Sequence, residues 1–193
     1  MARLPFHCGF IKGMNYIKIT KNDIANGAGV RCVLWVSGCD VHCKGCHNPS
    51  SWDFDAGQIF DDTAMEELIE ALSRPWVQGL TFSGGHPLAY NNLPGVYQVC
   101  KAIRERLPKK DIWLYTGYEL RANDFDNSVD IGWDNGLLRN HILAMCDVVV
   151  DGCYEESLRD ISLKFRGSSN QRIIDVKKTI KAKEICLWEG NIS

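Results

Sequence analysis

Three cysteines, Cys39, Cys43 and Cys46, lie close together in the spacing C-x3-C-x2-C. They follow residues 30–36, an apolar stretch that we expect to form a buried strand, so one loop carries all three thiols. An iron–sulfur cube is normally held by thiolates on all four irons. Three ligands would leave one iron open to another molecule, and an open position is typical of catalytic metal sites. The spacing therefore predicts a catalytic 4Fe-4S cluster at this loop.

The residues around the cysteines leave two other interpretations open. Either His42 or His47 could join the three cysteines as the fourth ligand of a structural zinc knuckle. Zinc modules are usually small, whereas this chain of 193 residues can bury a core of its own, which favours the cluster. A thiol–disulfide switch would need a resolving pair rather than three clustered thiols. Gly45 suits the cluster, because it lets backbone amides approach the sulfurs.

Length and charge limit the other function classes. The net charge is -2, from 22 basic and 24 acidic side chains, so no positive field favours nucleic acid as a partner. No apolar stretch approaches the roughly 20 residues that a membrane helix needs. Residues 1–13 lack the apolar core of a secretory signal. We therefore expect a single soluble, cytoplasmic domain with no nucleic acid and no membrane as partner.

Six further cysteines are scattered along the chain. In a reducing compartment, isolated thiols among apolar neighbours usually behave as small buried hydrophobic groups. We expect that role for all six, which are Cys8, Cys32, Cys100, Cys146, Cys153 and Cys186.

Strand and helix patterns alternate along the chain, which predicts an α/β fold of about five units without repeats or linkers. One helix should begin near residue 62, with Asp62 or Thr63 as its cap, and end before Pro75. The expected strands are 30–36, 79–83, 112–116, 146–151 and 172–175, and the other helices are 94–107 and 137–145.

Polar residues and glycines follow several of these strands, where ligands bind in parallel α/β folds. Gly84 and Gly85 end the second strand, and Thr116 and Tyr118 lie at the end of the third. Asp151 ends the fourth strand, where a role in the site and a role in capping the next turn are equally supported.

The motifs together resemble a known family. The C-x3-C-x2-C spacing is the hallmark of radical S-adenosylmethionine (SAM) enzymes, and residues 46–49, Cys-His-Asn-Pro, resemble the cluster loop of activases that install glycyl radicals. Four further stretches resemble the small activating enzymes of anaerobic ribonucleotide reductase, and they cover residues 14–175 in family order. These stretches are residues 26–31, 83–85, 113–118 and 166–171.

The resemblance implies a fold and a set of site residues. The fold would be an incomplete (β/α) barrel in one radical SAM domain, residues 14–180. Residues 1–13 would be an N-terminal extension, disordered or absent from the native protein, and residues 181–193 a C-terminal tail. Cys39, Cys43 and Cys46 would hold the cluster. The SAM contacts would be Gly45, Cys46, His47, Ser83, Gly84, Gly85, His86 and Arg166.

His86 departs from the family pattern. The family usually has an acidic residue after the two glycines, which receives the ammonium group of SAM. A neutral imidazole accepts only one hydrogen bond, and a protonated one repels an ammonium. The role of His86 therefore stays open at the level of sequence.

The resemblance also implies a reaction and partners. A radical SAM oxidoreductase of this family cleaves SAM reductively at its 4Fe-4S cluster, giving methionine and 5′-deoxyadenosine, and generates the glycyl radical of anaerobic ribonucleoside-triphosphate reductase. The electrons would come from a flavodoxin-like or other low-potential reductant. Two alternatives within the superfamily are activation of a formate-lyase type of glycyl radical enzyme and small-molecule chemistry of the deazaguanine type.

Overall fold

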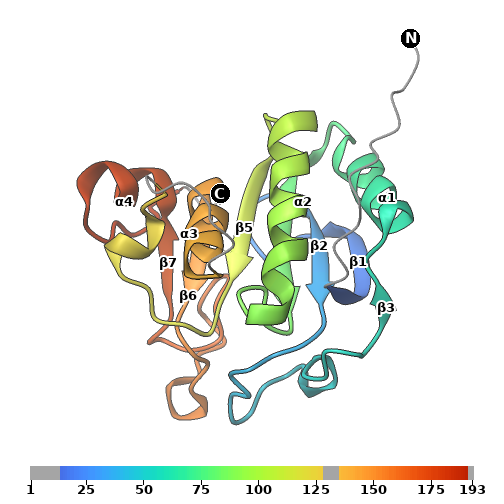
Figure 1. Ribbon diagram of the computed structural model, residues 1–193. Coiled ribbons are helices and arrows are strands. Elements are labelled where there is room, and N and C mark those ends of the chain that lie inside the picture. Colours follow the sequence, from blue (N-terminus) through green and yellow to red (C-terminus); the bar gives the residue numbers. More distant parts are fainter. Residues whose placement is uncertain (1–13, 128–134, 191–193) are drawn as a thin grey trace.

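The structure, a computed structural model, describes residues 14–127 and 135–190, so the predicted extension 1–13 lies outside the described residues. These ranges form one seven-stranded sheet in the order β3-β1-β2-β4-β5-β6-β7 (Figure 1). The strands are β1 Asn15–Asp23, β2 Val30–Val36, β3 Gln58–Ile59, β4 Val77–Gly84, β5 Asp111–Tyr115, β6 Val148–Asp151 and β7 Arg172–Asp175. The helices are α1 Asp62–Leu72, α2 Leu93–Arg106, α3 Asn135–Met145 and α4 Val176–Ala182, with short 3-10 helices at Pro49–Ser51, Tyr90–Asn92, Ala122–Phe125 and Glu156–Leu158.

The middle of the sheet is parallel and its edges are antiparallel. Strands β2, β4, β5 and β6 pair in parallel and in chain order, while β1, β3 and β7 pair antiparallel to their neighbours. Parallel neighbours need long crossover connections, which helices supply here. The predicted single α/β domain is confirmed. The sheet of the described residues is open, so the strand pairing alone does not establish the predicted incomplete barrel.

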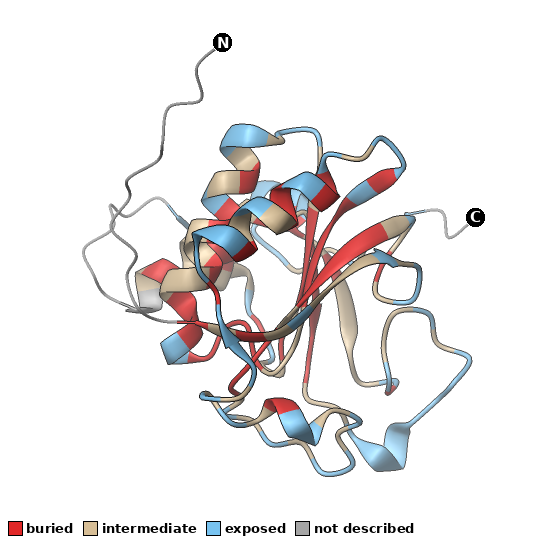
Figure 2. Ribbon diagram, turned by 90° about the vertical axis from the view of Figure 1, so that its right-hand side faces the viewer, coloured by how far each residue is buried: buried red, intermediate tan, exposed pale blue. Residues whose placement is uncertain are grey.

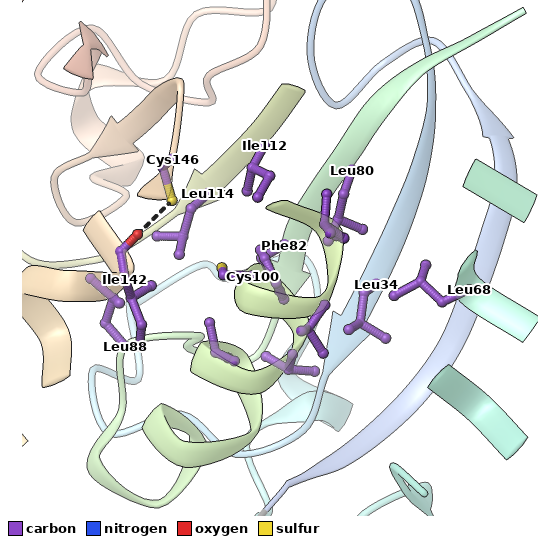
Figure 3. Packing of buried hydrophobic residues seen from close by; sticks show 14 of the residues in the cluster. Leu34, Leu68, Leu80, Phe82, Leu88, Cys100, Ile112, Leu114, Ile142 and Cys146 are labelled. Carbon is purple, nitrogen blue, oxygen red and sulfur yellow. Dashed lines mark hydrogen bonds between the residues drawn. The ribbon is translucent and has the colours of Figure 1, made fainter. Parts of the chain in front are cut away.

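The main core lies between the helices and one face of the sheet (Figure 2). Leu34, Leu80 and Ile112 come from three neighbouring strands and pack together with Leu68 of α1 and Cys100 of α2 (Figure 3). Each of these five residues is fully buried. Leu68 and Cys100 therefore lie on the faces of α1 and α2 that pack against the sheet.

Helix α1 begins at Asp62, as predicted, but its cap lies one residue earlier than we predicted. Its cap is Asp61, whose Oδ1 accepts a hydrogen bond from the backbone N–H of Ala64 at 2.9 Å, rather than Asp62 or Thr63. A run of three capping residue types fixes the position of a helix start only within a residue or two. No helix among the described residues is long and apolar enough to span a membrane.

The other face of the sheet carries a second, smaller core. Trp113 packs edge-to-face against Phe165 and Trp188, with ring centroids 5.5 and 5.0 Å apart. The segment after α4 returns to β7, where the Trp188 backbone N–H donates to the Ile173 carbonyl at 2.8 Å. Residues that follow the last helix thus cover part of this face.

Arg31 joins the beginnings of three parallel strands. It is fully buried, and its guanidinium donates to Thr81 Oγ1 at 2.7 Å and to Asp111 Oδ1 at 2.5 Å. The same group lies over the Trp113 ring, 5.2 Å from its centroid. A buried charge is tolerated only with partners of this kind. Arg31 therefore has a structural role at the end of the sheet opposite the cysteine loop.

Candidate iron–sulfur site

The cysteine loop leaves the sheet at the carboxyl end of β2. Gly38 begins it at φ 86°, and a Cβ added there would lie 2.0 Å from the Phe54 ring, so the turn requires glycine. The backbone N–H of Gly38 donates to Ser51 O, and that of Cys39 donates to Trp52 O, at 2.8 and 3.0 Å. The loop is thus held at its base by the short helix that follows it.

The three cysteines line one small cavity of ≈ 90 Å³. Its wall combines the cysteine loop with the ends of two parallel strands, as the strand order predicts. The lining residues are Cys39, Val41, Cys43, Cys46, Trp52, Gly84, Gly85, His86 and Gly117. Of the predicted site residues, the structure brings together Cys39, Cys43, Cys46, Gly84, Gly85 and His86, whereas Gly45, His47, Ser83 and Arg166 do not line the cavity.

The two glycines after β4 allow the strand end to lie directly against the cysteine loop. Gly84 has φ 100°, and a Cβ added at Gly85 would lie 2.4 Å from the carbonyl oxygen of Gly38. The amide side chain of buried Asn92 donates to the carbonyls of Ser37 and His86, both at 2.9 Å. Sequence reasoning missed Asn92, because its position inside a polar helix start carried no signal of a distant contact.

A carboxylate stands beside His86. His86 is 2% exposed, its Nδ1 lies 2.5 Å from Asp40 Oδ1, and its Nε2 lies 2.8 Å from Thr116 Oγ1. Tyr118 donates its hydroxyl to Asp40 Oδ2 at 2.7 Å. These four residues connect the cysteine loop to the ends of β4 and β5. Thr116 and Tyr118 therefore do lie next to the site, as their strand-end positions suggested.

Burial and pairing act in opposite directions on this network. Burial lowers the pKa of His86 below its ordinary value, although the contact with Asp40 opposes the shift. Burial alone would raise the pKa of Asp40, but the hydrogen bonds from His86 and Tyr118 outweigh it and lower that pKa. The site thus places a carboxylate of lowered pKa next to an imidazole of lowered pKa.

Trp52 offers a hydrogen-bond donor at the cavity. Its ring stacks on His42 with centroids 4.6 Å apart, and its Nε1 is buried with no acceptor among the described residues. A buried donor without a partner in a cavity lined by thiols suits a ligand with acceptor atoms, such as the sulfides of a cluster. The thiols, the close glycine backbone and this donor together fit an iron–sulfur cluster.

The polar string at residues 166–171 bonds mainly to itself and to the loop that follows β6. Arg166 Nη1 donates to the Gln171 carbonyl at 2.6 Å, and Gln171 Oε1 accepts from the backbone N–H of Gly167 at 2.8 Å. Asn170 Nδ2 donates to the Cys153 carbonyl at 2.8 Å. The string therefore shapes the loop that follows β6, and the predicted cofactor contact of Arg166 stays a prediction.

Asp151 has a structural role within the described residues. It is fully buried, accepts the Leu120 backbone N–H at 2.9 Å and pairs with Arg172, whose Nη2 lies 2.5 Å from Asp151 Oδ2. These contacts join β6 to β7 and to Leu120, and they differ from the cap of the next turn that the sequence suggested as the structural alternative.

Cys153 was not expected at the site. Of the scattered cysteines, Cys32, Cys100 and Cys146 are buried as predicted, Cys186 is only half-buried, and Cys8 lies outside the described residues. Cys153 is only half-buried, and its sulfur lies 3.0 Å from that of Cys43. The prediction that Cys153 is a buried hydrophobic thiol was wrong. Its partner Cys43 lies 110 positions away, so the sequence around Cys153 carries no sign of the contact.

The geometry gives the zinc knuckle no support. Among the described residues, no three His, Cys, Asp or Glu side chains converge closely enough to hold a single metal ion. His42 is stacked on Trp52, and His47 is exposed. A cluster distributes its thiolates over several irons, so it does not require such convergence.

A larger groove of ≈ 1060 Å³ lies elsewhere. It is formed at the opposite ends of the parallel strands, by residues that include Gly29, Gln78 and Asp111, and it contains none of the three loop cysteines. The candidate site is therefore identified by its three cysteines, although its cavity is smaller than this groove.

Comparisons with known proteins agree with this site. A family model described as "4Fe-4S single cluster domain" matches residues 25–174. A protein of Pasteurella multocida is 40% identical over 162 residues, which cover 83% of this chain and 96% of the relative. Proteins of Haemophilus influenzae and Escherichia coli K12 are each 39% identical, covering 83% and 82% of this chain and 97% and 96% of the relatives.

Each of these relatives carries the name anaerobic ribonucleoside-triphosphate reductase-activating protein. The match to the relatives covers most of the chain, and the residues matched by the family model, 25–174, include the cysteine loop and the strand ends that face it. The chain therefore belongs to the family of anaerobic ribonucleoside-triphosphate reductase-activating proteins and contains a 4Fe-4S single-cluster domain.

Proposed function

We propose that this protein activates an anaerobic ribonucleoside-triphosphate reductase by generating its glycyl radical at a 4Fe-4S cluster held by Cys39, Cys43 and Cys46. The observation that carries the proposal is the single cavity lined by these three thiols and by the Gly84–Gly85 backbone. The names of the relatives and the matched cluster domain support it.

The chain's own residues would bind, orient and shield the reactants. When bound, the cluster supplies an electron to SAM, whose reductive cleavage gives methionine and 5′-deoxyadenosine and removes a hydrogen atom from a glycine of the reductase. The backbone of Gly84 and Gly85, which lines the cavity wall, would contact the amino-acid part of SAM. Trp52 Nε1 would donate to a cluster sulfur and so tune its reduction potential.

The proposal extends to partners and fold. The protein substrate would be the reductase named in the relatives, and the electrons would come from a flavodoxin-like or other low-potential donor in the cytoplasm. The open sheet would be the incomplete (β/α) barrel of radical SAM enzymes, with its open side facing the reductase. A glycyl radical enzyme of the formate-lyase type is a less favoured substrate, because the relatives are named for the ribonucleotide enzyme.

The direct test is activation in an anaerobic assay. Reconstituted protein, SAM and a low-potential reductant are mixed with an anaerobic ribonucleoside-triphosphate reductase. The products to follow are 5′-deoxyadenosine and the glycyl radical, the latter by electron paramagnetic resonance. Replacing Cys39, Cys43 or Cys46 with alanine should abolish both products. Cys186→Ala, which changes a half-buried cysteine outside the cavity lining, is the matched control and should retain them.

The controls separate the possible failures. Deoxyadenosine without a glycyl radical on the reductase, but with one on a formate-lyase type of enzyme, would favour the alternative substrate. If any of the three alanine variants keeps full turnover, the assignment of the cluster ligands is wrong.

A further inference from the structure

Cys43 has two possible partners, a cluster iron and Cys153. It lines the cavity of the candidate cluster site, and its sulfur also lies 3.0 Å from the sulfur of Cys153, which does not line that cavity. A disulfide bond is about 2.05 Å long, so a shift of about 1 Å would bring the two sulfurs to bonding distance. Cys43 can ligate an iron or bond to Cys153, but not both.

The loop after β6 fixes Cys153 in this position. Gly152, at φ 95°, turns the chain, and Gln171 Nε2 donates to its carbonyl at 3.1 Å. Asn170 Nδ2 donates to the Cys153 carbonyl at 2.8 Å. The contact therefore rests on an ordered backbone held at two successive carbonyls, rather than on a free side chain.

The cysteine loop also lies close to the residues that follow Cys153. A Cβ added at Gly45 would lie 2.3 Å from Glu156 Oε2 and 3.3 Å from the Tyr154 ring. Gly45 has φ 79°, a conformation that glycine adopts without strain. In Figure 1, the loop after β2 and the segment after β6 both extend below the sheet. The Cys43–Cys153 contact is thus one part of a packed junction between two loops.

We propose that Cys43 and Cys153 form a reversible disulfide in the cluster-free protein, with a low-molecular-weight disulfide of the glutathione type as the oxidant. The Cys43 thiolate attacks one sulfur of the oxidant, forming a mixed disulfide and releasing one thiol. Cys153 then attacks the Cys43 sulfur and releases the second thiol. Two protons pass from the cysteines to the leaving thiolates, so the protein is oxidised by two electrons and the oxidant is reduced to two thiols.

The disulfide would withdraw one predicted cluster ligand and protect it. A disulfide can be reduced again, whereas sulfinic and sulfonic acids at Cys43 would not be. This consequence rests on the proposed ligand role of Cys43, but formation of the disulfide does not depend on SAM chemistry.

The test maps disulfides in the full-length chain. The cluster is removed with an iron chelator, the protein is treated with oxidised glutathione, free thiols are alkylated, and the unreduced digest is analysed by mass spectrometry. Wild type should give a linked Cys43–Cys153 peptide pair that disappears with dithiothreitol. Cys153→Ser should instead carry glutathione on Cys43, and Cys186→Ser should behave as wild type.

Two further measurements complete the test. Oxidised wild type should take up severalfold less iron and sulfide than reduced protein, and dithiothreitol should restore this uptake. The reconstituted holoprotein should resist oxidation at Cys43. Equal cluster uptake by reduced Cys153→Ser and wild type shows that the variant folds, and Cys153→Ala is the substitute if it does not.

Two results would overturn the proposal. One is a Cys43 linkage to Cys39 or Cys46 in wild type, and the other is glutathione that remains on Cys43 despite an intact Cys153. Neither result bears on SAM cleavage. Conversely, a protein that fails to activate any reductase could still form the disulfide, so the two proposals fail separately.

Discussion

At the scale of single residues, His86 lies where the family usually has an acidic residue, and the structure places Asp40 next to it. The family resemblance implies an acidic group after the two glycines, and this chain has an imidazole there. The structure places the Asp40 carboxylate 2.5 Å from that imidazole, and the ring's other nitrogen contacts Thr116. Both nitrogens of His86 are thus engaged within the protein. An acidic group thus lies next to His86, which lines the cavity, and it comes from the cysteine loop.

We therefore predict that Asp40→Asn weakens SAM binding severalfold, because the ammonium group of SAM loses a charged acceptor. Isothermal titration calorimetry of the reconstituted protein measures the effect. Binding of 5′-methylthioadenosine, which lacks the amino-acid part, should not change. Asp55→Asn, at an exposed carboxylate in the following loop, should bind both ligands as wild type does.

Unchanged SAM affinity in Asp40→Asn would show that Asp40 does not receive the ammonium. Equal losses for SAM and 5′-methylthioadenosine would indicate instead that the substitution disturbs the loop, through the lost contacts with His86 and Tyr118. Iron and sulfide content distinguishes a missing cluster from a missing contact.

At the scale of elements, Asp147 joins several parts of the fold. It precedes β6, and its Oδ2 accepts from Arg104 of α2 at 2.6 Å and from the Ile112 N–H of β5 at 2.9 Å. Lys177 of α4 lies 2.8 Å from Oδ1. Burial opposes ionisation, but the hydrogen bonds from Arg104, Lys177 and Ile112 outweigh it and lower the pKa of Asp147.

We expect Asp147→Asn to lower the free energy of unfolding by about 2 kcal/mol at pH 7, the scale of hydrogen bonds to a charged group. A lowered pKa means that this stabilisation is present above the unfolded value near 3.8 and is lost as the pH falls through the folded value. Urea unfolding at pH 7 and near pH 3 should therefore show a difference from wild type that shrinks in acid. A difference that is constant with pH would contradict the charge-based explanation, and Asp55→Asn is the control.

At the scale of the whole molecule, the sheet is covered differently on its two faces. Helices cover one face with a large apolar core, whereas Phe165 and Trp188 reach the other from loops and from the segment after α4. Leu187 forms a bridge with Ile174, which places the end of the described chain beside β7. The residues predicted as a C-terminal tail therefore contribute packing around Trp113.

Trp188→Ala should destabilise the protein by about 2 kcal/mol, below the 3–5 kcal/mol typical of fully buried Trp→Ala changes, because Trp188 is only partly buried. Chemical denaturation measures the loss. Trp76 is 59% exposed, so Trp76→Ala is the matched control and should change stability by less than about 0.5 kcal/mol. Equal effects of the two changes would show that the contact with Trp113 adds no stability.

The sequence by itself determined most of the elements and the chemical nature of the site, although it did not predict β1, β3 or α4. Apolar patterns predicted the parallel strands and three of the helices, because those patterns depend on neighbours a few residues apart. The cysteine spacing placed three thiols on one loop, and the strand order implied that Gly84 and Gly85 would face them. These inferences need only local geometry and the direction of parallel strands.

Only the tertiary structure decided how the site is completed. It paired Asp40 with His86, brought Cys153 to Cys43 and turned Arg166 toward its own loop. The first two contacts join residues 46 and 110 positions apart, and they depend on how two irregular loops pack. Loop packing follows no sequence period, so side chains that meet only through it leave no pattern in the sequence.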